Sequence, residues 1–307
     1  RNAALSASAM SWLPRLAKVA LAGSAATATA YVFQDEICDS KLTSACAPLK
    51  LFASTASASW TNSSSAFSDV FPISKKWEDN WDFRDPKSLV NEKKHNAADE
   101  EEKKKMLTEM TPTATRNIIL IRHGQYNMES TDLELTSLGR EQAAYVGARL
   151  AGLHSAKPFE RLIMSTMTRA TETANIILGK LPESVVRKSD PLLEEGAPYP
   201  PEPPVGHWRP HNKKFYSEGA RVEAAFRKYI HRASPKQKQE SFEVIVCHAN
   251  VIRYFVCRAL QFPPEGWLRM SLGNCSITWL VVRPDGRVSI RSLGDIGHIP
   301  QDKITFT

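Results

Sequence analysis

The sequence predicts an α/β fold with a mostly parallel sheet for the region from Arg116 to the C-terminus. The main observation is a short apolar segment followed by a longer segment with helical spacing of its apolar residues, a pattern that recurs along the chain. Such repeats are typical of parallel sheets with helices packed on their faces. The predicted strand and helix pairs are Ile118–Ile121 with Thr136–Leu150, Arg161–Ser165 with Thr168–Leu178, and Phe242–Cys247 with Asn250–Leu260.

Two further strands are predicted near the C-terminus. Ser276–Val282 and Arg287–Ile290 are separated by Pro284-Asp285-Gly286, a strong turn signal. A turn this short joins antiparallel strands. We therefore expect a hairpin that forms an antiparallel edge of the sheet.

The region before Arg116 differs in composition and divides into four parts. Residues 1–35 contain Arg1, Arg15 and Lys18 but no acid before Asp35, which is typical of a targeting segment. Its stretch Leu16–Phe33 could also span a membrane as a helix of about 27 Å, so a removable presequence and a membrane anchor both stay open. Residues 36–76 are expected to be a flexible linker, 77–82 form a Trp-rich motif, and 83–115 are expected to be a charged linker, in which 91–110 could instead be a charged helix.

Composition excludes several functional classes. The net charge is +7 and the pI is near 9.1, but the acids are interspersed and no nucleic-acid-binding motif is found. The five cysteines are odd in number and contain no C-x-x-C pair, which argues against a disulfide framework and a zinc site. A phosphate-bearing substrate agrees equally well with the basic charge.

The residues that carry chemistry follow the predicted strands directly. One strand ends in Arg122-His123-Gly124, the next leads through Ser165 to Arg169 in a helix, and a third ends in Cys247-His248. Ligands of open α/β sheets bind at the carboxyl ends of strands, so these side chains should meet. Taken singly, Arg169 could be a surface arginine and His248 a structural histidine. Together, two arginines and two histidines predict a pocket for a phosphate dianion.

These residues and their surroundings resemble the histidine phosphatase superfamily, in its phosphoglycerate mutase-like branch. The resemblance covers Arg116 to the C-terminus and implies a three-layer α/β/α sandwich. It also implies that His123 is the phosphorylated nucleophile and that Arg122, Arg169 and protonated His248 bind the phosphate, without a metal or another cofactor. The motifs are R-H-G at 122–124, L-T-x-x-G-x-x-Q-A at 135–143, S-x-x-x-R-A-x-x-T-A at 165–174, and the strand-terminal His248.

The family also uses an acid that protonates the leaving oxygen. Glu194 and Glu195 are adjacent candidates, and the resemblance favours Glu195 because it precedes Gly196. The sequence departs from the mutases of the family at two positions: Tyr126 stands where they carry a small hydroxyl residue, and Glu129 where they carry Asn. We therefore expect a phosphatase, with a phosphoglycerate mutase or a small-molecule phosphatase as the alternative. A scaffold without activity is disfavoured because the expected catalytic residues are present.

The Trp-rich motif resembles a W-D-x-N-W-D multimerisation motif of mitochondrial protein phosphatases in this superfamily. The resemblance implies a membrane-bound phosphatase of phosphoserine and phosphothreonine proteins, with phosphohistidine as a further substrate, that is activated by oligomerisation at mitochondria. Which mitochondrial membrane it would use stays open. Large aromatic side chains are typical anchors of interfaces, so contacts between copies are favoured over the alternative that the tryptophans dock on their own catalytic domain. The residues expected to hold neighbouring copies together are Trp77, Asn80, Trp81 and Asp82.

Overall fold

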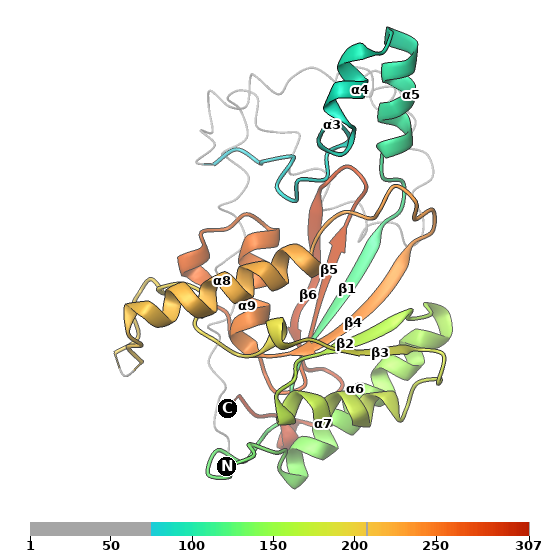
Figure 1. The fold of residues 1–307 in the computed structure, drawn as a ribbon. Helices are drawn as coiled ribbons and strands as arrows, with labels where there is room; N and C mark the ends of the chain where they lie inside the picture. The colour runs from blue at the N-terminus through green and yellow to red at the C-terminus, as the bar shows by residue number, and fades with distance from the viewer. Residues whose placement is uncertain (1–74, 207, 307) are drawn as a thin grey trace, which may run out of the picture. The chain divides into compact units, whose positions relative to one another are not determined.

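A six-stranded mixed sheet forms the centre of the computed structural model, which describes residues 75–206 and 208–306 (Figure 1). The strands are β1 (Arg116–Arg122), β2 (Arg161–Met164), β3 (Val186–Ser189), β4 (Ser241–Cys247), β5 (Ile277–Val282) and β6 (Val288–Asp295). They lie in the order β3-β2-β4-β1-β5-β6, and the first four of this order are parallel. The predicted hairpin is confirmed: β5 and β6 are antiparallel, and β5 is also antiparallel to β1.

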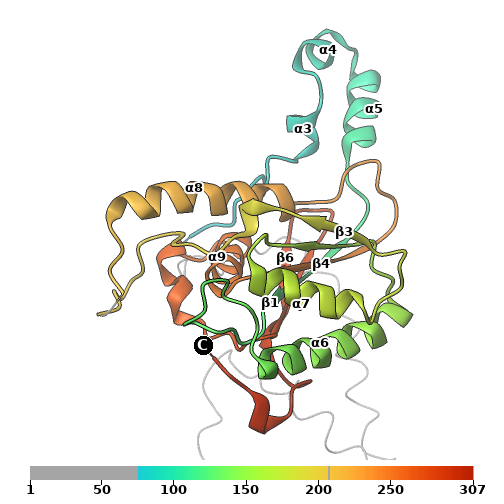
Figure 2. The ribbon, with the colours of Figure 1, turned by 60° about the horizontal axis from the view of Figure 1, so that its bottom comes forward.

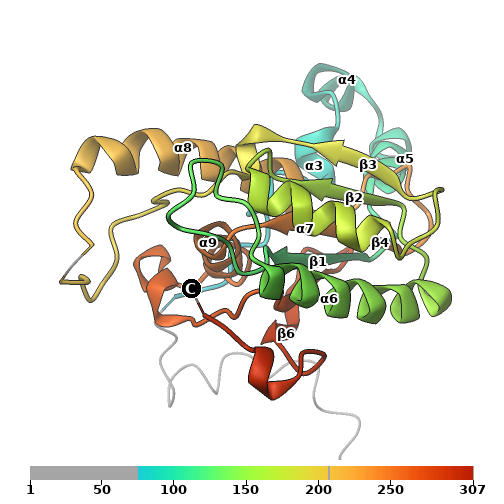
Figure 3. The ribbon, with the colours of Figure 1, turned by 90° about the horizontal axis from the view of Figure 1, so that it is seen from below.

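Helices cover both faces of the sheet, which confirms the predicted three layers. Successive residues of β1 alternate between two buried clusters, because side chains of a strand point to opposite faces. Ile118 belongs to a cluster with residues of α8 and α9, and Ile119 to a cluster with residues of α6 and α7. Figures 1 and 3 show α6 beside α7 and α9 beside α8. These helices are α6 (Ser137–Ala156), α7 (Thr168–Leu178), α8 (Asn212–Tyr229) and α9 (Ala249–Ala259).

Two elements were not expected from the sequence. β3 consists of exposed residues and includes Arg187 and Lys188, so it lacks the apolar run that marks a buried strand. It forms because it pairs with β2 at the edge of the sheet. α8 is strongly polar, yet Val222 and Phe226 are buried one turn apart, a periodicity that the sequence does contain.

The charged segment 83–115 contains three short helices, the helical alternative of the two considered for 91–110. They are α3 (Pro86–Leu89), α4 (Glu92–Ala97) and α5 (Glu100–Met110). Each begins after a side chain that accepts a hydrogen bond from the first turn: Asp85, Asn91 and Asp99. Figures 1 and 2 show the three helices together beyond the end of the sheet where β1 begins.

The predicted targeting segment 1–35 lies outside the described residues, as does nearly all of the predicted linker 36–76. In the part of the chain that the structure describes, no helix is both long and apolar enough to cross a membrane.

The Trp-rich motif packs against the α/β domain of its own chain. Trp81 is 8% exposed, its Nε1 donates to the carbonyl of Gly286 at 2.8 Å, and its ring lies 5.9 Å from that of Phe226. Asp82 forms a buried ion pair with Arg232, with 2.6 Å between the nearest atoms. The structure therefore shows the intramolecular arrangement that the sequence left open, and the role of the motif between copies stays a prediction.

The pairing of Asp82 with Arg232 is electrostatically favourable despite its burial. Burial raises the pKa of the Asp82 carboxyl, but hydrogen bonds from the Arg232 side chain and backbone, and its charge, bring that pKa below its usual value. The depressed pKa means that the carboxylate stabilises the fold above the pKa of the unfolded chain. This stabilisation is lost as the pH falls through the lower pKa of the folded state.

Close backbone packing against α6 holds the segment that follows β1 and His123. Gly139, in the first turn of α6, approaches Gln125 so closely that a Cβ built on it would lie 1.9 Å from the Gln125 carbonyl oxygen. The backbone N–H of Gln125 in turn donates to Gln142 Oε1 at 2.9 Å. The segment that follows His123 is thus held against α6 through backbone contacts that need a glycine.

Gly139→Ala should therefore push the 124–126 segment away from α6. We expect a loss of about 1–3 kcal/mol in the free energy of unfolding, as for other overpacked sites, measured by urea denaturation. Gly152→Ala in the same helix is the matched control, because nothing lies within 4 Å of a Cβ built there. That control should gain about 0.5–1 kcal/mol through helix propensity. Equal stability of the two variants would contradict the packing role of Gly139.

Candidate active site

His123 lies at the centre of the site, directly after β1, and is 2% exposed. The register between strands explains its neighbours. Arg122 pairs with Cys247 on parallel β4, and the backbone N–H of His123 donates to the Cys247 carbonyl at 3.0 Å. The residue after each of these strands therefore emerges at the same edge of the sheet, which brings His123 and His248 to 5.1 Å between ring centroids.

Two hydrogen bonds determine the tautomer of His123. Its Nδ1 lies 2.8 Å from the carbonyl oxygen of Gly124, which can only accept, so Nδ1 carries the proton. The Nε of Arg169 lies 3.2 Å from His123 Nε2 and can only donate. The lone pair of the imidazole is therefore on Nε2, the ring atom that faces the arginine.

The charge state of His123 follows from its surroundings. Burial, and then the positive charges of Arg122 and Arg169, hold the pKa of His123 well below its usual value. The ring is neutral at neutral pH, and its Nε2 lone pair is available for attack on an electrophile.

Arg122 and Arg169 are two buried cations whose charges act on this histidine. Burial lowers the pKa of Arg122 to about 10, so its guanidinium remains charged at neutral pH. One of its amino groups donates to the Leu272 carbonyl at 2.6 Å, whereas its buried Nε finds no hydrogen-bond partner among the described residues. The Arg169 guanidinium lies over the ring of Tyr126, 4.6 Å from its centroid. These positions leave guanidinium N–H groups for the oxygens of a phosphate.

His248 completes the predicted group of four. It is fully buried, and its Nε2 is 2.8 Å from the hydroxyl of Ser165, which follows β2. Burial, then the proximity of His123 and the nearby arginines, holds the pKa of His248 well below its usual value. Without a phosphate the ring is therefore neutral at neutral pH, and the protonated form expected beside a bound phosphate stays a prediction. A phosphate dianion beside it would favour the protonated form and raise that pKa.

The structure distinguishes the two adjacent glutamates. Glu194 forms a short hydrogen bond with the Thr166 hydroxyl near the surface. Burial raises the pKa of Glu195, although N–H groups of Gly196 and Asn250 and the charges of Arg169 and Arg122 act against this rise. Glu195 is therefore the carboxyl on which the charges of Arg169 and Arg122 act, and burial favours retention of its proton.

Several supporting residues of the site were missed from the sequence. Thr173 accepts from the Gly124 N–H at 3.0 Å and donates to the Arg169 carbonyl at 2.7 Å, which joins the two catalytic segments. Arg253, five positions after His248 on α9, acts on Glu195 through its charge. Its spacing from the strand-terminal histidine was the available signal, since both would lie near the start of one helix.

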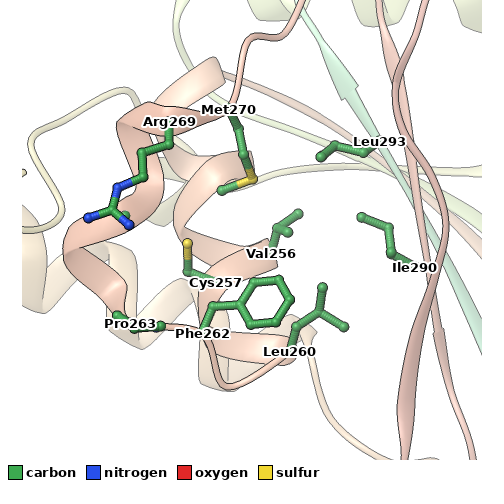
Figure 4. Close-up of a pocket in the computed structure, with 10 residues that line it drawn as sticks. Val256, Cys257, Leu260, Phe262, Pro263, Arg269, Met270, Ile290 and Leu293 are labelled. Carbon is green, nitrogen blue, oxygen red and sulfur yellow. The ribbon is translucent and has the colours of Figure 1, made fainter. Parts of the chain in front are cut away.

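A separate hollow of about 450 Å³ lies between α9, the 3₁₀-helix Pro264–Arg269 and β6. Figure 4 shows that its lining is largely apolar, with Val256, Leu260 and Phe262 on one side and Ile290 and Leu293 on the other. The catalytic candidates line none of it. The chemistry described above is therefore confined to the carboxyl edge of the sheet.

Comparison with known proteins identifies the family. The profile of the histidine phosphatase superfamily (branch 1) matches residues 118–198 and 199–295. The chain is 62% identical over 241 residues to the mitochondrial serine/threonine-protein phosphatase Pgam5 of Caenorhabditis elegans, covering 78% of this chain and 84% of that protein. It is 55% identical over 233 residues to the mitochondrial serine/threonine-protein phosphatase PGAM5 of Homo sapiens, covering 75% and 80%.

Among solved structures, a phosphoglycerate mutase from Plasmodium falciparum is 33% identical, with a TM-score of 0.45, and the match covers 64% of this chain and 100% of that one. The family profile extends over more than half of the chain and includes all of the residues that the geometry brings together at the sheet edge. The chain belongs to the histidine phosphatase superfamily, branch 1.

Proposed function

We propose that this protein is a phosphatase that removes phosphate from phosphoserine and phosphothreonine proteins, with phosphohistidine as a further substrate, through a phosphohistidine intermediate on His123. The observation that carries the proposal is the Nε2 lone pair of a neutral, buried histidine, 3.2 Å from the Arg169 Nε. The choice of protein substrates is supported by the names of the worm and human relatives, both serine/threonine-protein phosphatases.

The reaction proceeds in two displacements. In the first, His123 Nε2 attacks phosphorus, the P–N bond forms and the P–O bond to the substrate breaks. Glu195 gives its proton to the departing oxygen. In the second, the Glu195 carboxylate takes a proton from water, whose oxygen attacks the phosphohistidine and releases inorganic phosphate and neutral His123. General acid–base catalysis of this kind contributes about 10²–10⁴-fold.

The arginines and His248 stabilise the negative charge of the phosphoryl group, which is present in both displacements. Arg122 and Arg169 meet the equatorial oxygens of the transferring group, and removal of one such donor typically costs about 10²–10³-fold in rate. His248 gains a proton as the dianion binds and then donates to it. These groups supply the positive charge for which other phosphoryl-transfer enzymes use a divalent cation.

The shifted pKa values of His123 and Glu195 define the pH range in which the first reaction step is fast. His123 must be neutral, and its lowered pKa extends the active range downward. Glu195 must be protonated, and its raised pKa extends the range upward. The rate of phosphate transfer to the enzyme should therefore fall below the first pKa and above the second.

The mutase alternative is less well supported by the site. Tyr126 places an aromatic ring edge-on to His123, with centroids 5.3 Å apart, where the mutases of the family carry a small hydroxyl residue. Its ring also covers the Arg169 guanidinium. The space next to the nucleophile is thus lined by an aromatic surface, which favours the flank of a peptide over a second anionic group of a small metabolite.

We extend the proposal to location and assembly. The relatives are named mitochondrial, which supports a mitochondrial location with residues 1–35 as targeting segment or membrane anchor. For assembly, we propose that the contacts of Trp81 and Asp82 seen within one chain form between two copies, with the motif of one copy docked on the catalytic domain of another. Exchange of an identical element preserves every contact and is a low-cost route to oligomers. Trp77 and Asn80 would complete this exchanged motif.

Catalysis is tested with the purified full chain and peptides that carry phosphoserine or phosphothreonine. In EDTA, wild-type protein should release phosphate, and His123→Asn should be at least about 10³-fold slower because it lacks the nucleophile. His154→Asn is the control, since His154 lies near the end of α6 and accepts from the Phe159 N–H. Full activity of His123→Asn would exclude the mechanism. Efficient isomerisation of 3-phosphoglycerate with 2,3-bisphosphoglycerate, without peptide hydrolysis, would instead support a mutase.

Exchange of the motif is tested with charge reversal at the buried pair. Asp82→Arg and Arg232→Asp should each lower the mass of the assembly in light scattering, because breaking a buried pair typically costs about 3–5 kcal/mol. Mixing the two variants should restore the wild-type mass, since each motif then meets an opposite charge on the other chain. Glu100→Lys, which breaks an exposed pair with Lys103, is the control and should not change the mass. Wild-type mass in both unmixed variants would exclude the exchange.

A further inference from the structure

The loop that carries Glu195 is held by side chains, not by regular secondary structure. It follows the 3₁₀-helix Pro191–Leu193 and runs through Pro198 without joining a strand or an α-helix. An irregular segment fixes a catalytic side chain only when its backbone groups are bound by neighbours. Those neighbours come from α8 on one side and α9 on the other.

Arg221, on α8, binds three consecutive parts of this loop. One of its terminal nitrogens donates to the Leu192 carbonyl at 3.0 Å and to the Glu194 carbonyl at 2.6 Å. The other donates to the carbonyl of Glu195 itself at 2.9 Å. A planar guanidinium can reach three carbonyls at once because its donors form a rigid fork, which the single ammonium of lysine cannot reproduce.

Neighbouring residues hold the same loop from other directions. Glu218, one turn before Arg221, accepts from the Ala197 N–H at 2.6 Å. On the other side, Asn250 of α9 donates to the Gly196 carbonyl at 3.1 Å. A Cβ built on Gly196 would lie 2.7 Å from the Arg221 terminal nitrogen, so a side chain there would displace this arginine. The carbonyls of Glu194, Glu195 and Gly196 and the N–H of Ala197 are thus bound by side chains of two helices, α8 and α9.

None of these contacts reaches the carboxyl of Glu195 or the place of the phosphate directly. Arg221 binds the main-chain carbonyls of Glu194 and Glu195, so its contacts determine where the Glu195 carboxyl lies. Its charge also helps to lower the pKa of His248. A displacement of about 1 Å at a reacting group can cost on the order of 10²-fold in rate.

We propose that Arg221 is a positioning residue for the acid of this site, and that it controls how well the enzyme cleaves esters whose leaving oxygen must be protonated. The inference rests on the proposed phosphatase function and on Glu195 as the acid. It adds to that function a distinction between residues that act on the phosphoryl group and a residue that positions the acid. Arg122, Arg169 and His123 act on the phosphoryl group of any ester. The charge of Arg221 acts through His248 on all esters alike, whereas its hydrogen bonds to the acid loop affect protonation of the leaving oxygen.

Substrates with different leaving groups allow a measurement that would not change if Arg221 had a merely structural role. The oxygen of phosphoserine leaves as a strongly basic alkoxide unless it receives a proton, whereas p-nitrophenolate leaves readily without one. The value of kcat/KM covers the steps up to the first irreversible one, here the transfer to His123. The ratio of kcat/KM for the two substrates therefore reports protonation of the leaving oxygen and is independent of the hydrolysis of the intermediate.

The test compares p-nitrophenyl phosphate with a phosphoserine peptide in the full chain. Arg221→Met should lower kcat/KM for the peptide by on the order of 10–10²-fold more than for p-nitrophenyl phosphate. Arg221→Lys should show the same selective loss, and it replaces the first variant if that one does not fold. Arg227→Met is the matched control on the same helix, because Arg227 forms a half-exposed ion pair with Glu223 at 2.9 Å. It should leave the ratio unchanged.

Glu195→Gln completes the design. It should show the same selective loss, and adding Arg221→Met to it should lower the peptide rate little further, since both changes remove one function. An equal fall for both substrates in the Arg221 variants, or full additivity with Glu195→Gln, would overturn the positioning role. Absence of hydrolysis of either substrate by wild-type protein would instead refute the proposed phosphatase function, and the inference with it.

Discussion

The hydrogen bonds on the two nitrogens of His123 are the constraint on which the rest of the site depends. The Gly124 carbonyl holds the proton on Nδ1, and the Arg169 Nε faces the lone pair on Nε2. In the proposed mechanism a histidine in this state can attack as soon as substrate binds, because neither a tautomer change nor loss of a proton is needed. Burial, and then the surrounding positive charge, disfavour a protonated ring and keep it neutral, and the same positive charge attracts a dianion.

The residues proposed to bind phosphate and the proposed acid are held by different parts of the fold. The residues proposed to bind the phosphoryl group lie at the ends of β1 and β4 and at the start of α7, which follows β2, so their positions are tied to the parallel register. The acid lies on an irregular loop, and its position depends on side chains of α8 and α9. α8 links two regions, because Arg221 binds the acid loop while Phe226, further along the same helix, packs against Trp81 of the Trp-rich motif. Docking of the motif and placement of the acid thus share one rigid element.

Much of this architecture could be predicted from the sequence, because continuous apolar runs and residues at strand ends are local signals. Arg122, His123 and His248 are such residues, and the structure brings them together. The remainder depended on tertiary contacts. β3 is an edge strand defined by its partner, Glu194 and Glu195 differ only in their surroundings, and the neutral state of His248 results from burial and from charges distant in sequence. The internal docking of Trp81 likewise depends on Gly286 and Phe226, far along the chain.

The central claim is that phosphate passes through the Nε2 atom of His123, and trapping of the intermediate tests it most directly. Wild-type protein would be exposed briefly to a peptide with radiolabelled phosphoserine, quenched in alkali to preserve phosphohistidine, digested and sequenced by mass spectrometry. The geometry predicts an acid-labile label on the peptide that contains His123, attached at Nε2 and not at Nδ1. A label on any other residue of an active preparation, or attachment at Nδ1 of His123, would contradict it.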